Sequence, residues 1–435
     1  MITRIEALNY RCLRSVQQDL KPFQILVGAN GSGKSSFLDV PVLMGDMVRD
    51  GLEPAISRRA PDYSYLFWLR SGDRFKVAIE AQVPEERRAA LLAGIPQIDR
   101  YSAWRYLLEK QPPISCRYEL SIGRVSNALD ELCILEETVS LCLAALDPNV
   151  KAPVPSRGWG IQEPAFFPGN VVGDRLIVLF KRPPTGSGPT DQFYAENGTW
   201  AAPFNLGHRK SALANLPDDE GMFPVTTWFR RHLLAQTRRI VLDNEAIRAP
   251  SPRGSTDTLR PDGANLPWLI EQMDPARRSQ WLRHVQTVLP DLRDITTFLR
   301  EEDNTRYVKL HYTNGAEVRS WLVSDGTLRL LALTLLPYLP STKCVYLIEE
   351  PENTIHPTAI EAVLDSLRSV YDGQVIVATH SPVILGLADL GEVLCFSKAD
   401  DGSTQVVPGK EHRVLRNWRG EVNLGVLFAS GVLSS

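Results

Sequence analysis

The sequence predicts an α/β fold, with a mixed sheet flanked by helices at its core and a large lobe inserted into the chain. Three observations indicate this. Apolar segments alternate with helical patterns at both ends of the chain, and a glycine-rich loop follows the apolar segment at 23–27. Prolines and glycines are frequent in the middle of the chain, between residues 83 and 300. Continuous apolar strands that alternate with helices are typical of a parallel sheet covered on both faces. We therefore expect residues 1–82 and 301–435 to form the core, and residues 83–300 to form an α-rich, irregular insertion.

The composition is that of a globular protein. Of the 435 residues, 43% are hydrophobic and 23% charged, with a net charge of −3, which excludes a protein that is basic throughout. The apolar stretch 330–339 contains a proline and is far shorter than the ~20 residues that cross a bilayer. Charged residues interrupt segment 1–15, so no signal peptide is expected. The six cysteines include no CxxC pair, which favours reduced thiols. We expect a cytoplasmic protein without a membrane partner.

The N-terminal part is expected to form strands at 2–8, 23–27 and 75–80. Apolar residues alternate in the first of these segments and run continuously in the second. A loop at 28–33 and a helical pattern follow. Pro41 lies about two turns into that helix, where it removes a backbone hydrogen bond, so the helix is expected to kink or end early.

The middle of the chain contains strand patterns at 116–122, 132–136 and 176–180, and helical patterns at 226–237 and 276–288. Prolines and glycines between them, such as Pro153 and Pro183, predict loops. No heptad pattern is sustained, which excludes a long coiled-coil arm.

The C-terminal part has the clearest pattern. It predicts a strand at 308–312, an apolar helix at 324–338, a buried strand at 344–348, an amphipathic helix at 358–370 and a second buried strand at 375–379. Strands and helices that alternate in this way predict a parallel sheet.

The segment from Gly28 to Ser35, GANGSGKS, matches the phosphate-binding pattern GxxxxGK[ST]. Its glycines let backbone amides turn toward phosphate oxygens, Lys34 supplies a positive charge to the outer phosphates, and the Ser35 hydroxyl is a Mg²⁺ ligand. The strand before the loop and the helix after it are the context that this motif requires.

Two adjacent acids, Glu349 and Glu350, end the apolar strand at 344–348. Ligands bind at the carboxyl ends of parallel strands, and side chains alternate along a strand, so one acid is expected to serve Mg²⁺ and the other to face an attacking water. Alone, this pair would be interpreted as a solvated strand end. The presence of Lys34 upstream favours the functional interpretation.

Two further segments are ambiguous when taken alone. Ser324-Asp325-Gly326-Thr327 opens an apolar helix, where Ser324 is a good cap and free amides attract anions. His380 directly follows the strand at 375–379, on the ligand side of the sheet, although a lone histidine is more often structural.

Together and in this order, the four segments resemble the ABC-type ATPases, specifically the SMC-, RecF- and OLD-like branch of compact bacterial AAA-family ATPases. Residues 28–35 resemble Walker A and residues 324–327 the signature motif. Residues 345–350 resemble Walker B, with Glu349 where the family usually has aspartate. Residues 351–357 resemble the D-loop, and His380 resembles the switch histidine.

The resemblance implies a P-loop ATPase head that uses ATP and Mg²⁺ and works in pairs, the signature serine of one head touching the γ-phosphate held by the other. Glu350 would be the general base, His380 the γ-phosphate sensor, and Lys34 a further catalytic residue. Ser35 and Glu349 would hold Mg²⁺, Glu349 directly or through water. The implied nucleotide contacts are Asn30, Gly31, Ser32, Gly33, Lys34, Ser35, Ser36, Arg11, Ser324, Asp325 and Gly326.

Three positions have weaker counterparts in the family. Arg11 resembles the basic residue that contacts ATP near the N-terminus of SMC-like heads. Arg58 or Arg59 stands where those heads carry an arginine loop, and Gln82 is the nearest candidate for the Q-loop glutamine. A solvated side chain is the default interpretation for each arginine.

Arginines are frequent between residues 226 and 300, with acids interleaved. A solvated helix face is the simpler interpretation, and a contact with the DNA backbone is the alternative.

The resemblance favours an ATP-dependent switch that dimerises and controls a separately encoded effector, in anti-phage defence by analogy. Too little chain follows His380 for the TOPRIM nuclease domain of OLD proteins, so a nuclease effector is expected on another polypeptide. One alternative is a RecF-like repair ATPase that binds DNA itself. Another is a scaffold that binds ATP without hydrolysing it.

Overall fold

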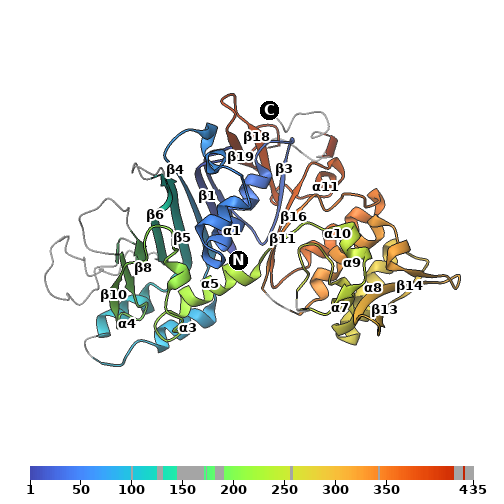
Figure 1. The fold of residues 1–435 in the computed structure, drawn as a ribbon, viewed down its shortest axis with the longest axis horizontal. Helices are drawn as coiled ribbons and strands as arrows, with labels where there is room; N and C mark the ends of the chain where they lie inside the picture. Colours follow the sequence, from blue (N-terminus) through green and yellow to red (C-terminus); the bar gives the residue numbers. More distant parts are fainter. Residues whose placement is uncertain are drawn as a thin grey trace. The chain divides into compact units, whose positions relative to one another are not determined.

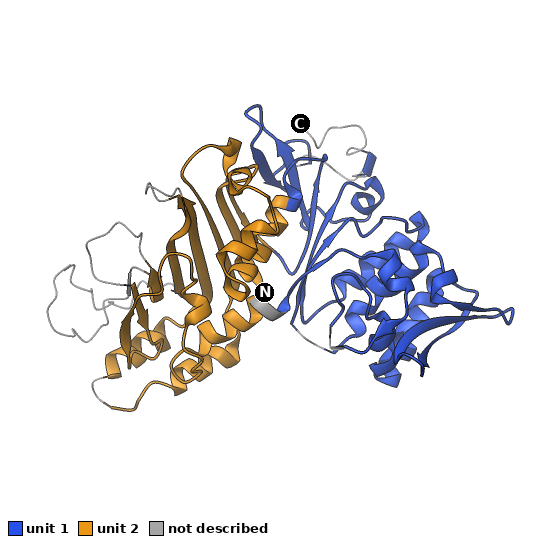
Figure 2. Cartoon of the chain, in the orientation of Figure 1, with its two compact units in different colours: residues 1, 21–35, 236–435 blue, residues 2–20, 36–235 orange. Residues whose placement is uncertain are grey.

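The computed structural model describes residues 1–98, 101–124, 131–144, 171–172, 174–181, 191–254, 258–340, 343–415 and 425–426. They belong to two compact units, coloured separately in Figure 2. Unit 1 comprises residues 1, 21–35 and 236–435, and unit 2 comprises residues 2–20 and 36–235. The chain therefore passes between the units several times, and each unit is assembled from segments distant in sequence.

Unit 2 is built on an antiparallel sheet (Figure 1). Its strand order is β10 (Ala201–Phe204), β9 (Asp191–Tyr194), β8 (Arg175–Lys181), β6 (Leu132–Leu143), β5 (Pro113–Arg124), β4 (Arg74–Gln82), β1 (Ile2–Tyr10) and β2 (Leu13–Asp19), with β7 (Val171–Val172) paired to β8. Its helices are α1 (Lys34–Arg49), which starts in unit 1, α2 (Leu52–Ser57), η1 (Tyr63–Leu66), η2 (Trp68–Arg70), α3 (Glu85–Ala93), α4 (Ser102–Lys110), η4 (Leu213–Asn215) and α5 (Pro224–Gln236).

Helices α1 and α5 lie side by side over this sheet (Figure 1). A side chain at Gly45 of α1 would meet the carbonyl of Leu233 in α5, and the ring of Tyr118 in β5 packs edge-on against Phe229 of α5. The expectation of an early helix end is wrong, because α1 continues through Pro41 to Arg49 with most of its residues buried. Packing of this apolar helix outweighs the loss of one backbone hydrogen bond.

Unit 1 contains the expected parallel sheet, in the order β11 (Thr237–Ile240), β16 (Val345–Glu349), β17 (Gln374–Thr379), β3 (Phe23–Gly28) and β18 (Val393–Lys398). A last strand, β19 (Thr404–Pro408), is antiparallel to β18. The strands β16, β17 and β3 are almost entirely buried, as their continuous apolar sequences predict.

Helices and a small antiparallel sheet complete unit 1. The helices are α6 (Asn244–Arg248), α7 (Leu266–Gln272), α8 (Pro275–Val288), η5 (Ser320–Leu322), α9 (Asp325–Leu335), η6 (Leu336–Tyr338), α10 (Pro357–Arg368) and α11 (Pro382–Gly386). The small sheet has the order β12 (Ser251–Pro252), β14 (Thr305–Tyr312) and β13 (Leu292–Arg300), with β15 (Glu317–Arg319) paired to β14. One apolar core joins α8, α9, α10 and both sheets, and within it the buried indole of Trp281 donates to Thr334 at 3.0 Å.

The expected strands and helices are confirmed, but the units do not follow the expected boundaries at residues 82 and 300. The middle of the chain contributes β5 and β6 to the sheet begun by β1 and β4, and β11 to the sheet that contains β16. These pairings join distant segments, which local patterns do not reveal. The expected loops at Pro153 and Pro183 lie outside the described residues. Within the part of the chain that is described, no helix is long and apolar enough to cross a membrane.

Candidate active site

The glycine-rich loop connects β3 to α1 at the carboxyl end of the parallel sheet. Gly31 and Gly33 have φ angles of +76° and +104°, which residues with a side chain rarely adopt. The ammonium group of Lys34 donates to the carbonyls of Gly28 and Ala29, at 2.7 and 3.0 Å. Lys34 is partly buried, and burial lowers its pKa, against the opposing effect of nearby carboxylates.

The other loop residues differ in exposure. Asn30 and Ser35 are exposed, whereas Ser32 is buried, and its hydroxyl has no hydrogen-bond partner within the described chain. Ser36 accepts a hydrogen bond from the Cys12 thiol at 3.4 Å. The loop thus offers open backbone, a free hydroxyl and a lysine at one place, which is the chemistry that binds phosphate.

The first strand-end acid, Glu349, lies beside this loop. The Ser35 hydroxyl donates to Glu349 Oε2 at 2.5 Å, so a hydroxyl and a carboxylate oxygen meet. No group of three or more His, Cys, Asp and Glu side chains forms a possible metal site among the described residues. A single carboxylate and a hydroxyl fit Mg²⁺, which usually binds one or two carboxylates together with substrate phosphates.

The second acid, Glu350, faces His380. His380 Nδ1 lies 3.0 Å from Glu350 Oε1, and the Asn353 amide donates to Glu350 Oε2 at 2.7 Å. Glu350 has a φ of +48°, in the left-handed region that few non-glycine residues adopt. Strain of this kind persists only where the surrounding structure holds it, and here Asn353 and His380 contact the carboxylate of this residue.

Glu352 is a residue that the sequence patterns did not single out. It accepts a short hydrogen bond from the Thr379 hydroxyl, which in turn accepts from the Ser381 amide at 2.9 Å. Burial raises the pKa of Glu352. These bonds fix the turn that presents His380. The only available signal was the acid's position between Pro351 and Asn353, directly after the two strand-end acids.

Ser324 caps helix α9, accepting from the Thr327 amide at 3.3 Å, and it is exposed. Asp325 forms an ion pair with Arg248 at 2.6 Å, so it holds the start of the helix in place. Gly326 packs so closely on the carbonyl of Thr354 that an added Cβ would come within 2.4 Å of it. The exposed cap is therefore held against the segment that follows the strand-end acids.

The segment between β11 and α6 is tied to helix α9. The Arg329 guanidinium donates to the Leu242 carbonyl and to Asn244 Oδ1, at 2.9 and 3.0 Å. Arg248 of α6 also donates to the Val323 carbonyl at 3.0 Å. Helix α9 is thus bonded through Arg329 to the segment after β11, and the residue before its cap, Val323, is bonded to α6 through Arg248.

Unit 2 contains Arg11 and also Arg58 and Arg59, the two candidates for the arginine loop. Arg59 is buried and donates through Nε to both oxygens of Asp39 at 2.9 Å and through Nη1 to Asp46 at 2.9 Å. Arg58 is exposed and pairs with Asp50. Arg11 has a φ of +52° and lies 3.3 Å from Asp39.

These positions bear on two weaker assignments. Arg59 is fully engaged inside unit 2, so of the two arginines Arg58 is the one with a guanidinium open to solvent. Gln82 is the exposed last residue of β4 in the antiparallel sheet. It does not follow a strand of the parallel sheet.

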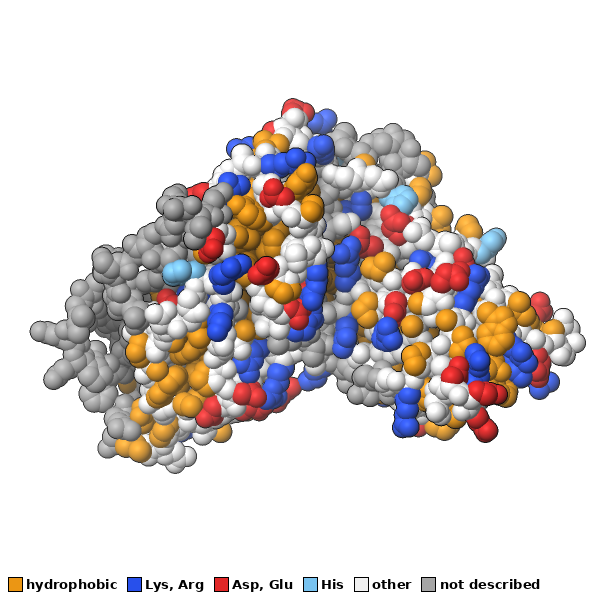
Figure 3. Space-filling model, viewed as in Figure 1, with side chains coloured by type: hydrophobic (Ala, Val, Ile, Leu, Met, Phe, Trp, Pro, Cys, Tyr) orange, Lys and Arg blue, Asp and Glu red, His pale blue; other side chains and the backbone are white. Residues whose placement is uncertain are grey.

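Many arginines of the segment 226–300 bond within the chain. Arg230 and Arg231 pair with Asp218, and Arg278 lies 3.5 Å from Asp294. Basic and acidic side chains are interspersed over unit 1 on the face seen in Figure 3. Many arginines of this segment are therefore engaged in ion pairs with acidic residues of the same chain.

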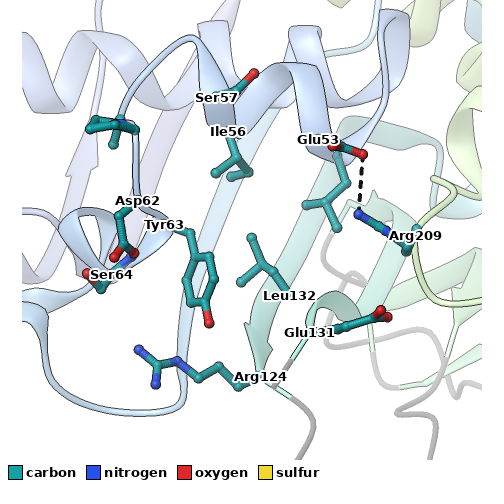
Figure 4. A pocket seen from close by; sticks show the side chains of 13 residues that line it. Glu53, Ile56, Ser57, Asp62, Tyr63, Ser64, Arg124, Glu131, Leu132 and Arg209 are labelled. Carbon is teal, nitrogen blue, oxygen red and sulfur yellow. Dashed lines mark hydrogen bonds and ion pairs between the residues drawn. The ribbon is translucent and has the colours of Figure 1, made fainter. Parts of the chain in front are cut away.

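Unit 2 also has a cavity of about 750 Å³ between α2, η1 and the end of β5 (Figure 4). Charged and apolar side chains both line it, and Glu53 and Arg209 pair at 3.3 Å at one side. None of the residues expected to contact the nucleotide lines this cavity.

Comparison with known proteins bears on the identity of this site. A profile of the family described as "AAA domain, putative AbiEii toxin, Type IV TA system" matches residues 180–386. The match includes Ser324, Glu349, Glu350 and His380 but begins after the glycine-rich loop. Protein ea59 of Escherichia phage lambda is 34% identical over 86 residues, which are 19% of this chain and 16% of that protein. The alignment therefore spans a small part of that relative.

Among solved structures, an SmcHead bound to the C-winged helix domain of ScpA aligns over 93% of this chain and 96% of its own, with a TM-score of 0.51 and 16% identity. This likeness shows the fold of a P-loop ATPase head. The chain therefore has the fold of a P-loop ATPase head like that of the SmcHead, and its segment 180–386 is similar to the matching AAA family.

Proposed function

We propose that this protein binds ATP with Mg²⁺ and hydrolyses it to ADP and phosphate. One observation carries the proposal: Lys34 and Ser35 of the phosphate loop converge with Glu349, Glu350 and His380 at the carboxyl end of one parallel sheet. Residues up to 346 positions apart in sequence, Lys34 and His380, meet where α/β sheets bind ligands.

Each side chain has a chemical task in this proposal. The loop amides and Lys34 bind the phosphates, and Ser35 and Glu349 hold Mg²⁺, which neutralises phosphate charge. Glu350 orients a water and accepts its proton, since its carboxylate is already aimed by Asn353 and His380. His380, exposed beside Glu350, donates to the transferred phosphoryl group.

Pairing with a second copy is the second part of the proposal. Ser324 is exposed at the tip of α9, where backbone amides and the helix dipole attract an anion. The phosphate loop and this tip belong to one chain, and the tip would complete the site of a neighbouring copy. We propose that pairing controls a separately encoded effector, such as a nuclease, in anti-phage defence. The toxin-related description of the matching family supports that assignment.

Replacing Glu350 with glutamine tests the enzymatic part. The variant should bind ATP, hydrolyse it at least 100-fold more slowly, as expected for loss of a general base, and accumulate as dimers in size-exclusion chromatography with light scattering. Glu361→Gln, on an exposed position of α10, is the matched control and should behave like wild type. Turnover at the wild-type rate in Glu350→Gln would refute the assignment of the base.

Direct DNA binding remains the alternative to effector control. It predicts affinity for duplex DNA that falls steeply with salt. Since many arginines of segment 226–300 are paired internally, we expect weak binding that does not change ATP turnover. Co-purification of a neighbouring gene product would support effector control instead.

A further inference from the structure

The most informative contact that the proposed reaction does not use is made by Arg239. This residue lies on β11, the edge strand of the parallel sheet, next to the strand β16 that ends in Glu349. Its Nε and Nη2 atoms lie 2.9 and 2.7 Å from Glu349 Oε1. The two groups are 110 residues apart in sequence, so only the sheet pairing brings them together.

The two oxygens of Glu349 have separate partners. Arg239 occupies Oε1 with two nitrogens, and Ser35 occupies Oε2 with its hydroxyl. The oxygen that faces Ser35, and with it the expected Mg²⁺ position, is left clear of the arginine. Arg239 therefore contacts Oε1, the oxygen that does not contact Ser35, and this contact can persist when a cation binds at Oε2.

The contact with Arg239 matters because the residue at position 349 is a glutamate. Glutamate has one more rotatable bond than aspartate, the shorter carboxylate side chain, so it loses more conformational freedom when it is fixed. The planar guanidinium offers two donors in a rigid fork, and such forks hold carboxylates with defined geometry. Partners behind a ligand that fix its orientation commonly change metal affinity by 10- to 100-fold when removed.

We propose that Arg239 is a positioning residue that holds Glu349 in the orientation that binds Mg²⁺, compensating for the longer side chain at this position. This inference rests on the proposed binding of ATP and Mg²⁺. It concerns the affinity for the metal, and it assigns Arg239 no contact with the nucleotide.

The test is a Mg²⁺ titration of the full chain with a fluorescent, non-hydrolysable ATP analogue, followed by anisotropy. Arg239→Ala should raise the Mg²⁺ concentration at half-saturation by about tenfold, while binding of the analogue in EDTA stays unchanged. Arg239→Lys keeps the charge but not the fork and should give an intermediate shift. Arg283→Ala, an exposed arginine on α8, is the charge-matched control and should shift nothing.

A double-mutant cycle separates positioning from general electrostatics. An aspartate at position 349 is one methylene shorter and should lose the paired contact with Arg239, so adding Arg239→Ala to Glu349→Asp should change half-saturation less than twofold. An unchanged or lower Mg²⁺ requirement in Arg239→Ala would overturn the inference, and so would an undiminished effect in the Glu349→Asp background. Failure of the wild-type protein to bind the analogue at any Mg²⁺ concentration would instead refute the proposed function.

Discussion

Replacing Arg59 with alanine should destabilise unit 2 more than most single substitutions would. Arg59 is buried and bonds to Asp39 and Asp46, both in α1, with donor–acceptor distances of 2.9 Å. Asp39 also accepts from the buried Tyr10 hydroxyl at 2.6 Å. Truncation would leave two carboxylates in a low-dielectric environment without their shared cation.

The magnitude follows from the remaining partners. Breaking a buried ion pair by removing one side typically costs about 3–5 kcal/mol. Asp39 would keep Tyr10 and Arg11, and Asp46 would keep Arg49, so we expect the lower end, about 3 kcal/mol. Arg58→Ala removes the exposed neighbouring arginine and should leave the free energy of unfolding nearly unchanged.

Hydrogen exchange in increasing urea is the suitable assay, because it reports on each unit separately. Peptides from α1 and β1 should lose protection in Arg59→Ala at lower urea than in wild type, and peptides from β16 and β17 should not. Combining Arg59→Ala with Asp39→Ala should cost less than the sum of the single changes. A loss below 1 kcal/mol would refute the view that this arginine holds α1 in place.

Three further changes have distinct expected results. Ser324→Arg should leave ATP binding to a single head intact but abolish dimers in light scattering, and loss of binding by the single head would mean that Ser324 acts within its own chain. Gly326→Ala should lower the melting temperature, at a cost of about 1–3 kcal/mol, because its Cβ would meet the Thr354 carbonyl at 2.4 Å; an unchanged melting temperature would contradict this packing. Burial raises the pKa of Glu196 from 4.5 to about 7. The free energy of unfolding should therefore fall by up to about 3 kcal/mol as pH rises from 4.5 to 7, because the unfolded chain loses this carboxyl proton first. Urea titrations of Glu196→Gln, which has no titratable carboxyl group at this position, should not show that fall.

Local patterns predicted the strands and helices well, because buried parallel strands and capped helices have strong local signatures. The pattern around Lys34 also predicted a glycine-rich loop between a strand and a helix, although it did not specify the positive φ angles of Gly31 and Gly33. The contacts of Glu349 and Glu350 were beyond sequence reasoning. Arg239 reaches Glu349 through the pairing of β11 with β16, and the turn in which Asn353 contacts Glu350 includes a positive φ at Glu350.

Two neighbouring residues illustrate the same limit. Sequence alone cannot distinguish Arg58 from Arg59, since both follow the same helix, yet one guanidinium faces solvent and the other is enclosed by acids of α1. The extent of the antiparallel sheet was also missed. Its strands join residues on both sides of position 82, and proline-rich stretches between them gave no signal of that pairing.

The bonds between the loop after β11 and helix α9 have a mechanical consequence. Through Arg329, helix α9 behind the Ser324 cap is bonded to the segment that follows β11, the outermost strand of the parallel sheet, and β11 also contacts Glu349, the proposed Mg²⁺ ligand. If two heads pair as proposed, a cation bound by Glu349 in one head would be linked, through Arg239, β11 and Arg329, to the surface that this head presents to the other. The bonds that fix the proposed metal ligand would then also hold the proposed pairing surface in place.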